Sequence, residues 1–465
     1  MTEEENKSGI MKWVIAIVVF ILLVVLAVLG IMFFAKDSSV AKKIGDALPF
    51  GTLSPETPRT GFDGKEGGGE NAGGDGVFTG TTGQPEPLFR QLTEKEIAGA
   101  TAILRDGKTY VRYMLRENGR VHEIDTTTWS DTELTNTDVH RVYEAYFGNN
   151  GNTVVLRYLK LDQLTRQDVI KTFLADLVLP EQGAGATPGK LVGKDLLDNI
   201  SSVSISPDGT LLFFLYPIAD GVSGKQIRLA DGDDPREIFR NSFSEWIPQV
   251  LNNGTIILTT KASAKIPGYS YLYQPKTRAL TRLVREKNGL TALGDSDGSR
   301  ILFNENIGTN VTLGLYSQKG HYTEGGYTTY ETGIPLTTRP EKCAWGIANR
   351  ALFFCGSFQS GTRNQIPDDW YQGLLHLKDT FWMVNADTEE IKHLADPQME
   401  IKRDFDVFMP FLGSSDNQFF FTDKNTGFLW VLRVVRPEGM IGDGSATLPP
   451  PTPEEASDAS GSTTN

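Results

Sequence analysis

Short apolar stretches alternate with polar turns along the middle of the chain, and this pattern recurs seven times. Asn-Gly and Asp-Gly pairs are the strongest short signals for a β-hairpin, because both residues tolerate a positive φ. The turns are Asp106-Gly107, Asn150-Gly151, Asp208-Gly209, Asn253-Gly254 and Asp297-Gly298, with degenerate copies at Ala348-Asn349 and Asp416-Asn417. Their spacings of 44, 58, 45, 44, 51 and 68 residues predict a tandem β repeat.

The strands that follow these turns are continuously apolar, as at residues 211–215, 256–258 and 419–421. Such runs indicate burial on both faces of a sheet. In a two-sheet sandwich the outer face of each sheet is exposed to solvent, so apolar and polar residues alternate along its strands. Radially stacked blades cover both faces. Seven units between residues 88 and 434 have about 50 residues each, near the length of known propeller repeats. We therefore predict an all-β fold, a seven-bladed β-propeller at 88–437, with six or eight blades as the alternatives.

One copy of the repeat also carries a resemblance to a known family. Ser206-Pro207-Asp208-Gly209-Thr210, followed by the apolar residues 211–214, resembles the repeat of TolB-like β-propellers. The Trp-Asp dipeptide of the standard WD repeat does not occur in the chain. The resemblance implies a rigid disc of a kind used mainly for protein binding, often in the cell envelope, and it supplies no catalytic residues.

The ends of the repeat region suggest how the disc closes. The last unit has three apolar strands and then breaks at Pro437, whereas residues 88–92 resemble the fourth strands of other units. We predict that this N-terminal strand completes the last blade, because an unpaired edge would be left exposed otherwise.

A long apolar segment precedes the propeller. Residues 13–35 carry no charge and are flanked by Lys12 and Lys36, and as a helix they would span about 34 Å, enough to cross a bilayer. A cleaved signal peptide is the alternative, but its apolar core runs about 7 to 15 residues. We predict an uncleaved single-pass signal anchor that follows a cytoplasmic tail at 1–12. The flanking lysines do not decide the orientation.

Two arms differ from the propeller in composition. Residues 36–87 are rich in Gly, Pro, Ser and Thr, and residues 438–465 in Pro, Ser, Thr and acids. Neither buries enough apolar area to fold, so we predict a flexible linker and a disordered tail. The net charge of −13 lies mostly outside the disc, because residues 1–12, 36–87 and 438–465 contribute −1, −3 and −5, which leaves −4 for the propeller. This acidic balance argues against nucleic acid as a partner.

The two cysteines, Cys343 and Cys355, are equidistant from the turn residue Asn349. In a symmetric hairpin they face each other at a distance that a disulfide can bridge. The alternative is that the two cysteines are not bonded and pack as small buried apolar residues. We predict the disulfide, which implies an oxidising compartment and hence a propeller outside the cytoplasm.

The sequence provides few candidates for catalysis or metal binding. The five histidines, His122, His140, His321, His376 and His393, lack the spacing of helical ligand pairs. Asp295 and Asp297 have the spacing of a calcium loop, but they coincide with a repeat turn and the later ligands are absent. We predict no cofactor, no metal site and no enzymatic activity.

An insertion at 357–377 stands apart from the repeat and contains Asp368-Asp369-Trp370-Tyr371. Long propeller loops often bind partners, and Trp and Tyr are frequent interface anchors. These four residues are our candidate binding residues. The alternative is that Trp370 and Tyr371 fold down to plug the channel or cover the edge of the blade.

Together these features predict a membrane-anchored, extracytoplasmic propeller that acts as a protein-binding or scaffolding module of the cell envelope. One alternative is an envelope enzyme that acts on a glycan or peptide in the channel. Another is a transmembrane sensor whose output comes from a partner. The pattern predicts envelope proteins as partners but neither their identity nor the oligomeric state.

Overall fold

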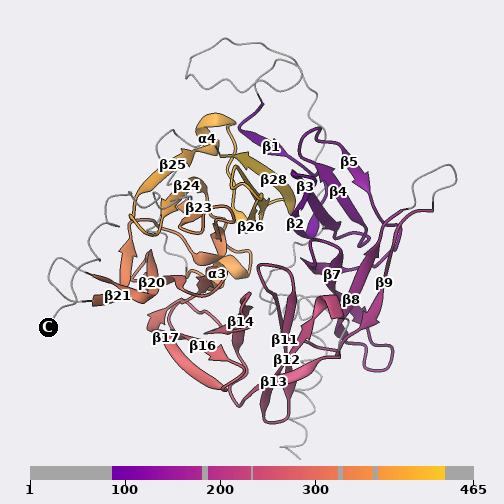
Figure 1. The fold of residues 1–465 in the computed structure, drawn as a ribbon, viewed down its shortest axis with the longest axis horizontal. Helices are drawn as coiled ribbons and strands as arrows, with labels where there is room; N and C mark the ends of the chain where they lie inside the picture. Colours follow the sequence, from indigo (N-terminus) through magenta and orange to yellow (C-terminus); the bar gives the residue numbers. More distant parts are fainter. Residues whose placement is uncertain (1–85, 181–186, 232–233, 323–327, 360–364, 435–465) are drawn as a thin grey trace, which may run out of the picture.

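The computed structural model describes residues 86–180, 187–231, 234–322, 328–359 and 365–434, which form a disc of seven four-stranded antiparallel sheets (Figure 1). The prediction of a seven-bladed propeller is therefore confirmed. The predicted anchor at 13–35 and tail at 438–465 lie outside the described residues, as does the linker up to residue 85. In the part of the chain that is described, no helix has the length and apolarity needed to span a membrane.

In each blade the first strand lies next to the axis of the disc and the last lies at its rim (Figure 1). Blades one and two are β2 (Ile97–Arg105), β3 (Lys108–Leu115), β4 (Val121–Asp125) and β5 (Asp131–Glu133), then β6 (Val142–Gly148), β7 (Thr153–Leu161), β8 (Asp168–Val178) and β9 (Lys190–Asp195). Blades three and four are β10 (Ser202–Ile205), β11 (Leu211–Ile218), β12 (Gly221–Arg228) and β13 (Arg236–Asn241), then β14 (Trp246–Val250), β15 (Ile256–Thr260), β16 (Pro267–Gln274) and β17 (Ala279–Asn288).

The remaining blades follow the same order. Blades five and six are β18 (Ala292–Gly294), β19 (Arg300–Ile307), β20 (Asn310–Tyr322) and β21 (Thr328–Ile334), then β22 (Cys343–Trp345), β23 (Leu352–Phe358), β24 (Asp379–Asn385) and β25 (Ile391–Ala395). Blade seven is β26 (Val407–Leu412), β27 (Gln418–Asp423), β28 (Phe428–Arg433) and β1 (Phe89–Gln91). Short helical turns occur at η1 (Leu229–Asp231), η2 (Pro340–Lys342), α3 (Asp368–Tyr371) and α4 (Pro397–Glu400).

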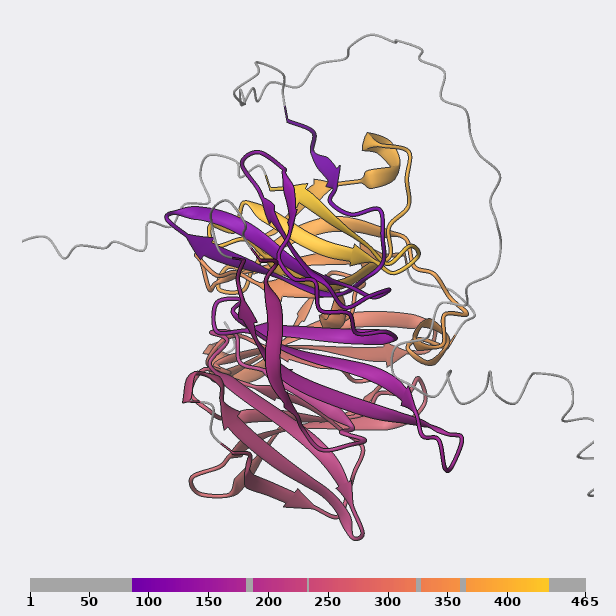
Figure 2. The ribbon, with the colours of Figure 1, turned by 90° about the vertical axis from the view of Figure 1, so that its right-hand side faces the viewer.

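The continuously apolar strands are buried on both faces, as their sequence predicts. In β11 the side chains of Leu212, Phe213, Phe214 and Leu215 are all fully buried. Leu212 and Phe214 join an apolar cluster with residues of blade two, whereas Phe213 and Leu215 join a cluster with residues of blade four. Successive residues of one strand therefore bind the two neighbouring blades together. Figure 2 shows the stacked blades from the side of the disc.

The repeat turns connect the first and second strands of each blade and gather on one face of the disc, which we call the turn face. Neighbouring turns are joined by hydrogen bonds: Asn149 N donates to Gly209 O at 2.7 Å, and Asp208 N donates to Asn252 Oδ1 at 2.9 Å. Gly209 has a φ of 71°, and a Cβ there would lie 2.9 Å from Asn149 N. Glycine is thus required both for the turn and for the approach of the next blade.

The predicted closure is confirmed, because β1 pairs with β28 in the register Phe89↔Leu432, Arg90↔Val431 and Gln91↔Trp430. The ring of Phe89 lies 5.4 Å from that of Phe381 and 5.6 Å from that of Phe405. Both ends of the described chain leave from this blade at the turn face, since Arg433 N donates to Leu88 O and Val434 N donates to Asn417 O.

The predicted disulfide is also confirmed. Cys343 of β22 and Cys355 of β23 are directly opposite in the ladder, and their Cα atoms are 4.1 Å apart. The bond joins the innermost strand of blade six to the second one.

Truncation of Phe89 tests how far the closing strand contributes to stability. Because this side chain is buried against the rings of Phe381 and Phe405, we expect Phe89→Ala to lower the free energy of unfolding by about 3–5 kcal/mol. Leu104→Ala, at a side chain that is 51% exposed, serves as the control and should change stability little. Chemical denaturation of both variants measures the difference, and equal stabilities would contradict a structural role for β1.

Candidate functional site

The insertion in blade six forms a short cap, residues 365–377, on the face of the disc opposite the turn face. It lies between β23 and β24, and its helix α3 lies near the axis (Figure 1). The Asp368 carboxylate accepts hydrogen bonds from Ala264 N at 2.6 Å and Ser263 Oγ at 3.3 Å, both in blade four. Asn306 of blade five donates to the carbonyl oxygen of Ile366. The cap therefore reaches across the face to two other blades.

Trp370 is the centre of the cap. Its side chain is fully buried in a small apolar cluster with Ile366, Leu375 and Leu377 of the cap. The indole Nε1 donates to the Asp406 carboxylate at 3.0 Å. Lys424 Nζ donates to the Trp370 carbonyl oxygen at 2.8 Å, so blade seven holds both the side chain and the backbone.

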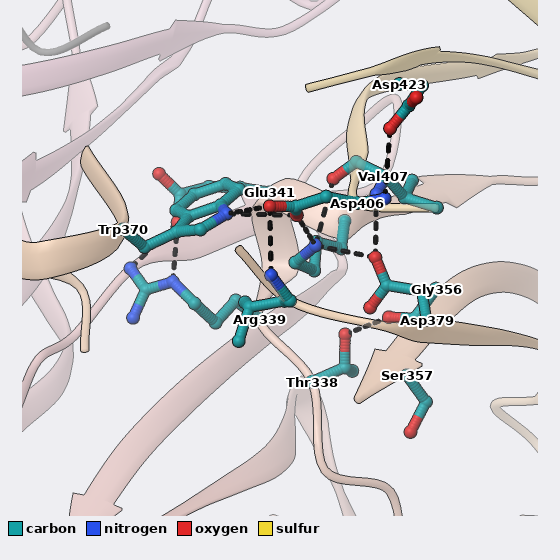
Figure 3. A network of polar contacts seen from close by, with 12 residues as sticks. Thr338, Arg339, Glu341, Gly356, Ser357, Trp370, Asp379, Asp406, Val407 and Asp423 are labelled. Carbon is teal, nitrogen blue, oxygen red and sulfur yellow. Dashed lines mark hydrogen bonds and ion pairs between the residues drawn. The ribbon is translucent and has the colours of Figure 1, made fainter. Parts of the chain in front are cut away.

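A buried ionic cluster of Lys342, Asp379 and Asp406 lies next to Trp370. Figure 3 shows Asp406 beside the Trp370 indole, and Asp379 on the far side of Asp406. Lys342 Nζ donates to Asp379 Oδ2 and Asp406 Oδ1, each at 2.6 Å, and to the Val407 carbonyl oxygen at 3.1 Å. All three side chains are inaccessible to water. Since the three donors of the ammonium group are all used, the cation is fully satisfied.

The two carboxylates of the cluster are held by backbone groups as well. Val407 N donates to Asp379 Oδ2 at 2.6 Å, and Leu377 N donates to Asp406 Oδ2 at 3.1 Å. One cation faces two carboxylates, and Asp379 Oδ1 has no hydrogen-bond partner among the described residues. Burial raises the pKa of Asp379 to about 6, with the nearby Asp406 adding to the rise and Lys342 opposing it.

A second polar group holds the other end of α3. Tyr371 Oη donates to Glu341 Oε1 at 2.5 Å, and Arg339 pairs with the same carboxylate at 2.7 Å. The Arg339 side chain is completely buried, and Arg339 also donates to Tyr371 Oη at 3.2 Å. Burial raises the pKa of Tyr371 well above its ordinary value, so the hydroxyl remains a donor.

These contacts show where the four candidate binding residues lie. Trp370 is buried and Tyr371 half-buried, which matches the alternative in which both fold down over the blade. Asp368 and Asp369 are half-buried, and Asp369 Oδ2 accepts from Gln365 N at 2.7 Å. The structure thus assigns packing contacts to all four residues, and their role in binding stays a prediction. Sequence reasoning missed Lys342, Asp379 and Asp406, which lie at three separate places in the chain.

A cavity of about 470 Å³ lies along the axis at the turn face. Its wall contains residues from six blades, including the apolar residues Leu293, Trp345, Ile347, Pro410 and Phe411 and the polar residue Asp295. Cys343 of the disulfide also lines it. This volume falls in the range of small-molecule and side-chain binding sites.

The cavity wall carries a motif that sequence reasoning passed over. Gly294-Asp295-Ser296-Asp297-Gly298 fits the Gly-x-Ser-x-Gly pattern of hydrolase nucleophile elbows. In the structure it joins β18 to β19, strand to strand, whereas a nucleophile elbow leads from a strand into a helix. Ser296 Oγ is buried and has no hydrogen-bond partner in the described part of the chain, so no histidine there activates it as a nucleophile.

His122 lies in a separate pocket between blades seven and one. Its Nδ1 is 3.3 Å from Asp131 Oδ1, its ring stacks on Tyr113, and Tyr113 Oη donates to Asp131 Oδ2 at 2.6 Å. Among the residues placed by the structure, no group of three or more His, Cys, Asp or Glu side chains could hold a metal ion.

No protein-family model and no curated protein sequence matches the chain. Solved structures similar to it include an oligogalacturonate lyase in complex with manganese, at 11% identity and a TM-score of 0.46, covering 75% of this chain and 93% of the lyase. TolB from Acinetobacter baumannii matches at 13% identity and a TM-score of 0.37, covering 62% of this chain and 64% of TolB.

The β-propeller domain of the Trilobed protease from Pyrococcus furiosus matches at 10% identity and a TM-score of 0.39, covering 61% of this chain and 77% of that domain. At these values the likenesses carry no argument about function, and the fold assignment rests on the strand order of the chain itself.

The raised pKa of Asp379 predicts a pH dependence of stability. The folded protein keeps this proton up to about pH 6, whereas the unfolded chain releases it near the ordinary value of 3.8. The contribution of Asp379 to the free energy of unfolding therefore increases as the pH falls from 7 towards 4 and is lost as the pH rises through about 6. We expect Asp379→Asn to remove this component.

Denaturant unfolding at pH 7 and pH 5 measures this pH-dependent contribution as the difference in the free energy of unfolding between wild type and Asp379→Asn. Asp106→Asn, at an exposed turn position, is the control and should follow the wild-type profile. Identical pH profiles for wild type and Asp379→Asn would contradict the assignment.

Two substitutions, one at a buried and one at an exposed residue of the cap, distinguish a role of the cap in stability from a role in binding. Trp370→Ala should lower the free energy of unfolding by about 3–5 kcal/mol, because it opens a cavity and removes one of the donors to the buried Asp406 carboxylate. Leu374→Ser, at a cap side chain that is 71% exposed, should leave stability within about 0.5 kcal/mol. Calorimetric or denaturant unfolding compares them. The folded Leu374→Ser variant is then the appropriate protein in which to test binding by the cap.

Proposed function

We propose that the chain is a single-pass membrane protein whose propeller lies outside the cytoplasm and binds a protein partner, as a scaffolding module of the cell envelope. The cavity on the turn face carries this proposal. It is built from the innermost strands and turns of six blades, and its wall is largely apolar. Concave, preformed and mostly apolar sites with few polar groups are the usual form of binding sites.

The surroundings of the cavity support a protein as its partner. Ile347, in the turn of blade six that borders the cavity, is 57% exposed, and Trp345 and Phe411 are half-buried in its wall. Aromatic and aliphatic side chains of this kind are frequent anchors of protein interfaces. The turns that carry them are tied to their neighbours by hydrogen bonds, so a partner would lose little free energy in ordering them.

The location rests on two features of the sequence and one of the structure. Residues 13–35 have the length and apolarity of a membrane span, and residues 36–87 have the composition expected of a linker to the disc. The disulfide between Cys343 and Cys355 favours an oxidising compartment.

Crosslinking in intact cells, followed by purification of the tagged full-length protein, tests the binding role. We expect a partner protein to be recovered with crosslinks at the turn face, and Ile347→Arg to reduce its recovery at least tenfold by placing a bulky positive charge at the mouth of the cavity. Leu164→Arg is the matched control, since Leu164 is 94% exposed in a connection on the opposite face. Equal recovery with both variants would refute binding at the turn face, and turnover of a glycan or peptide by the isolated protein would favour an enzyme.

Fractionation tests the location independently. The full chain should sediment with membranes and resist extraction by alkaline carbonate, because a membrane span cannot be released without detergent. A chain that starts at residue 36 should be soluble. Protease added to intact cells should reach the propeller, and protection of the propeller would place it in the cytoplasm instead.

A further inference from the structure

Most polar groups in the wall of the turn-face cavity are satisfied by neighbouring blades. The side-chain amide of Gln249 brackets Gly294, accepting from its N–H at 2.7 Å and donating to its carbonyl oxygen at 2.9 Å. Trp345 Nε1 donates to Leu293 O at 3.1 Å. The inner strands are thus joined across the wall, and these groups offer little to a ligand.

Asp295 and Ser296 differ from the rest of the wall. Of the described residues that line the cavity, these two carry buried side-chain atoms without a hydrogen-bond partner, Asp295 Oδ1 and Ser296 Oγ. Asp295 is 5% exposed, and its other oxygen, Oδ2, accepts from Ser299 Oγ at 2.7 Å. One acceptor of a buried carboxylate and one hydroxyl, adjacent in sequence, are therefore unused.

Asp295 also lacks a counter-ion. In the segments that the structure describes, no Lys, Arg or His side chain forms an ion pair with it, and Arg350 at the edge of the cavity lies instead 3.9 Å from Asp297. Burial raises the pKa of Asp295 above its ordinary value; hydrogen bonds from Ser299 and from the backbone of Arg300 and Gly298 oppose the rise, and the nearby Asp297 carboxylate adds to it. A buried carboxylate without a cation costs free energy, and a cationic ligand would recover it.

The turn itself does not require a carboxylate at this position. In blade three the equivalent residue is Ser206, whose hydroxyl accepts from Leu211 N at 2.9 Å. In blades four and six the equivalents are Leu251 and Gly346. Since the same hairpin forms around a hydroxyl, an isobutyl group or no side chain, the negative charge in blade five has another explanation.

We infer that the turn-face cavity binds a primary ammonium group, presented by a lysine side chain of the protein partner, with Asp295 as its counter-ion. This inference rests on the proposed function and names the group that the cavity recognises. Ser296 Oγ is the second acceptor, and Leu293, Trp345 and Phe411 surround the methylene chain of the lysine. Both acceptors are shielded from water in the empty cavity, so binding requires the Asp295 carboxylate to turn toward the ligand.

The number of free acceptors favours lysine over the other cations. A guanidinium group binds a carboxylate best through both oxygens, and Asp295 Oδ2 is already used by Ser299. An ammonium is a compact charge that needs single acceptors. A divalent metal would need more ligands than Asp295 and Ser296 provide.

Titration of the full-length protein with two small probes tests this directly. The probes are Nα-acetyl-lysine N-methylamide and its norleucine analogue, which has a similar side chain without the charge, and binding is followed by ligand-detected NMR. We expect saturable binding of the lysine probe, at least tenfold tighter than the norleucine probe. Asp295→Asn should weaken binding of the lysine probe at least tenfold and abolish the preference, and Ser296→Ala should weaken it severalfold.

Asp106→Asn is the matched control, because Asp106 holds the equivalent position in the turn of blade one, is exposed and does not line the cavity, and it should bind the lysine probe like the wild type. The thermal melting temperature of each variant shows whether it is folded, and the comparison of the two probes in the unmodified protein needs no variant. Equal binding of both probes, no saturable binding, or wild-type affinity in Asp295→Asn would each overturn the inference.

The same variant separates this inference from the proposed function. If a partner is captured in cells equally well by the wild type and Asp295→Asn, the protein-binding function stands and the lysine site is refuted. If the lysine probe binds as expected but no protein is captured at the turn face, the site stands and the proposed function fails.

Discussion

Burial of both faces of the inner strands is the constraint on which the disc depends. In β11, alternate side chains enter the cores shared with blade two and with blade four, so no blade can bury its own apolar surface alone. The ring must therefore be complete, and β1 completes it by pairing with β28. Hydrogen bonds between the repeat turns, such as that from Asn149 to Gly209, fix the same neighbours at one face.

The two faces of the disc differ in how their buried carboxylates are neutralised. Under the cap, Asp379 and Asp406 share Lys342 as an internal cation, and the cluster holds Trp370 in place. At the turn face, Asp295 is buried without any such cation among the described residues. A paired buried charge fixes a conformation, whereas an unpaired one leaves a preference for an external cation. The structure thus separates an end where the buried carboxylates have an internal cation from one where the buried carboxylate has none among the described residues.

Local patterns in the sequence were sufficient to predict the blades, the closing strand and the disulfide, because each depends on neighbouring residues or on a repeat. The ionic cluster could not be predicted in this way, since Lys342 lies 37 residues from Asp379 and 64 from Asp406. Trp370 was equally ambiguous, because exposure and burial of an aromatic loop residue look alike in sequence. Asp295 was attributed to turn geometry, and what distinguishes it from Ser206 in the equivalent turn is the carboxylate oxygen Oδ1, which has no hydrogen-bond partner among the described residues.

The position of β1 has a mechanical consequence. The segment that precedes residue 86 joins the disc through a strand of three residues, which is also the strand that closes the ring. Any tension on that segment is applied first to the three residue pairs between β1 and β28 and to the packing of Phe89. Force on that segment would therefore act on the closing strand before it reaches the inner strands of any blade.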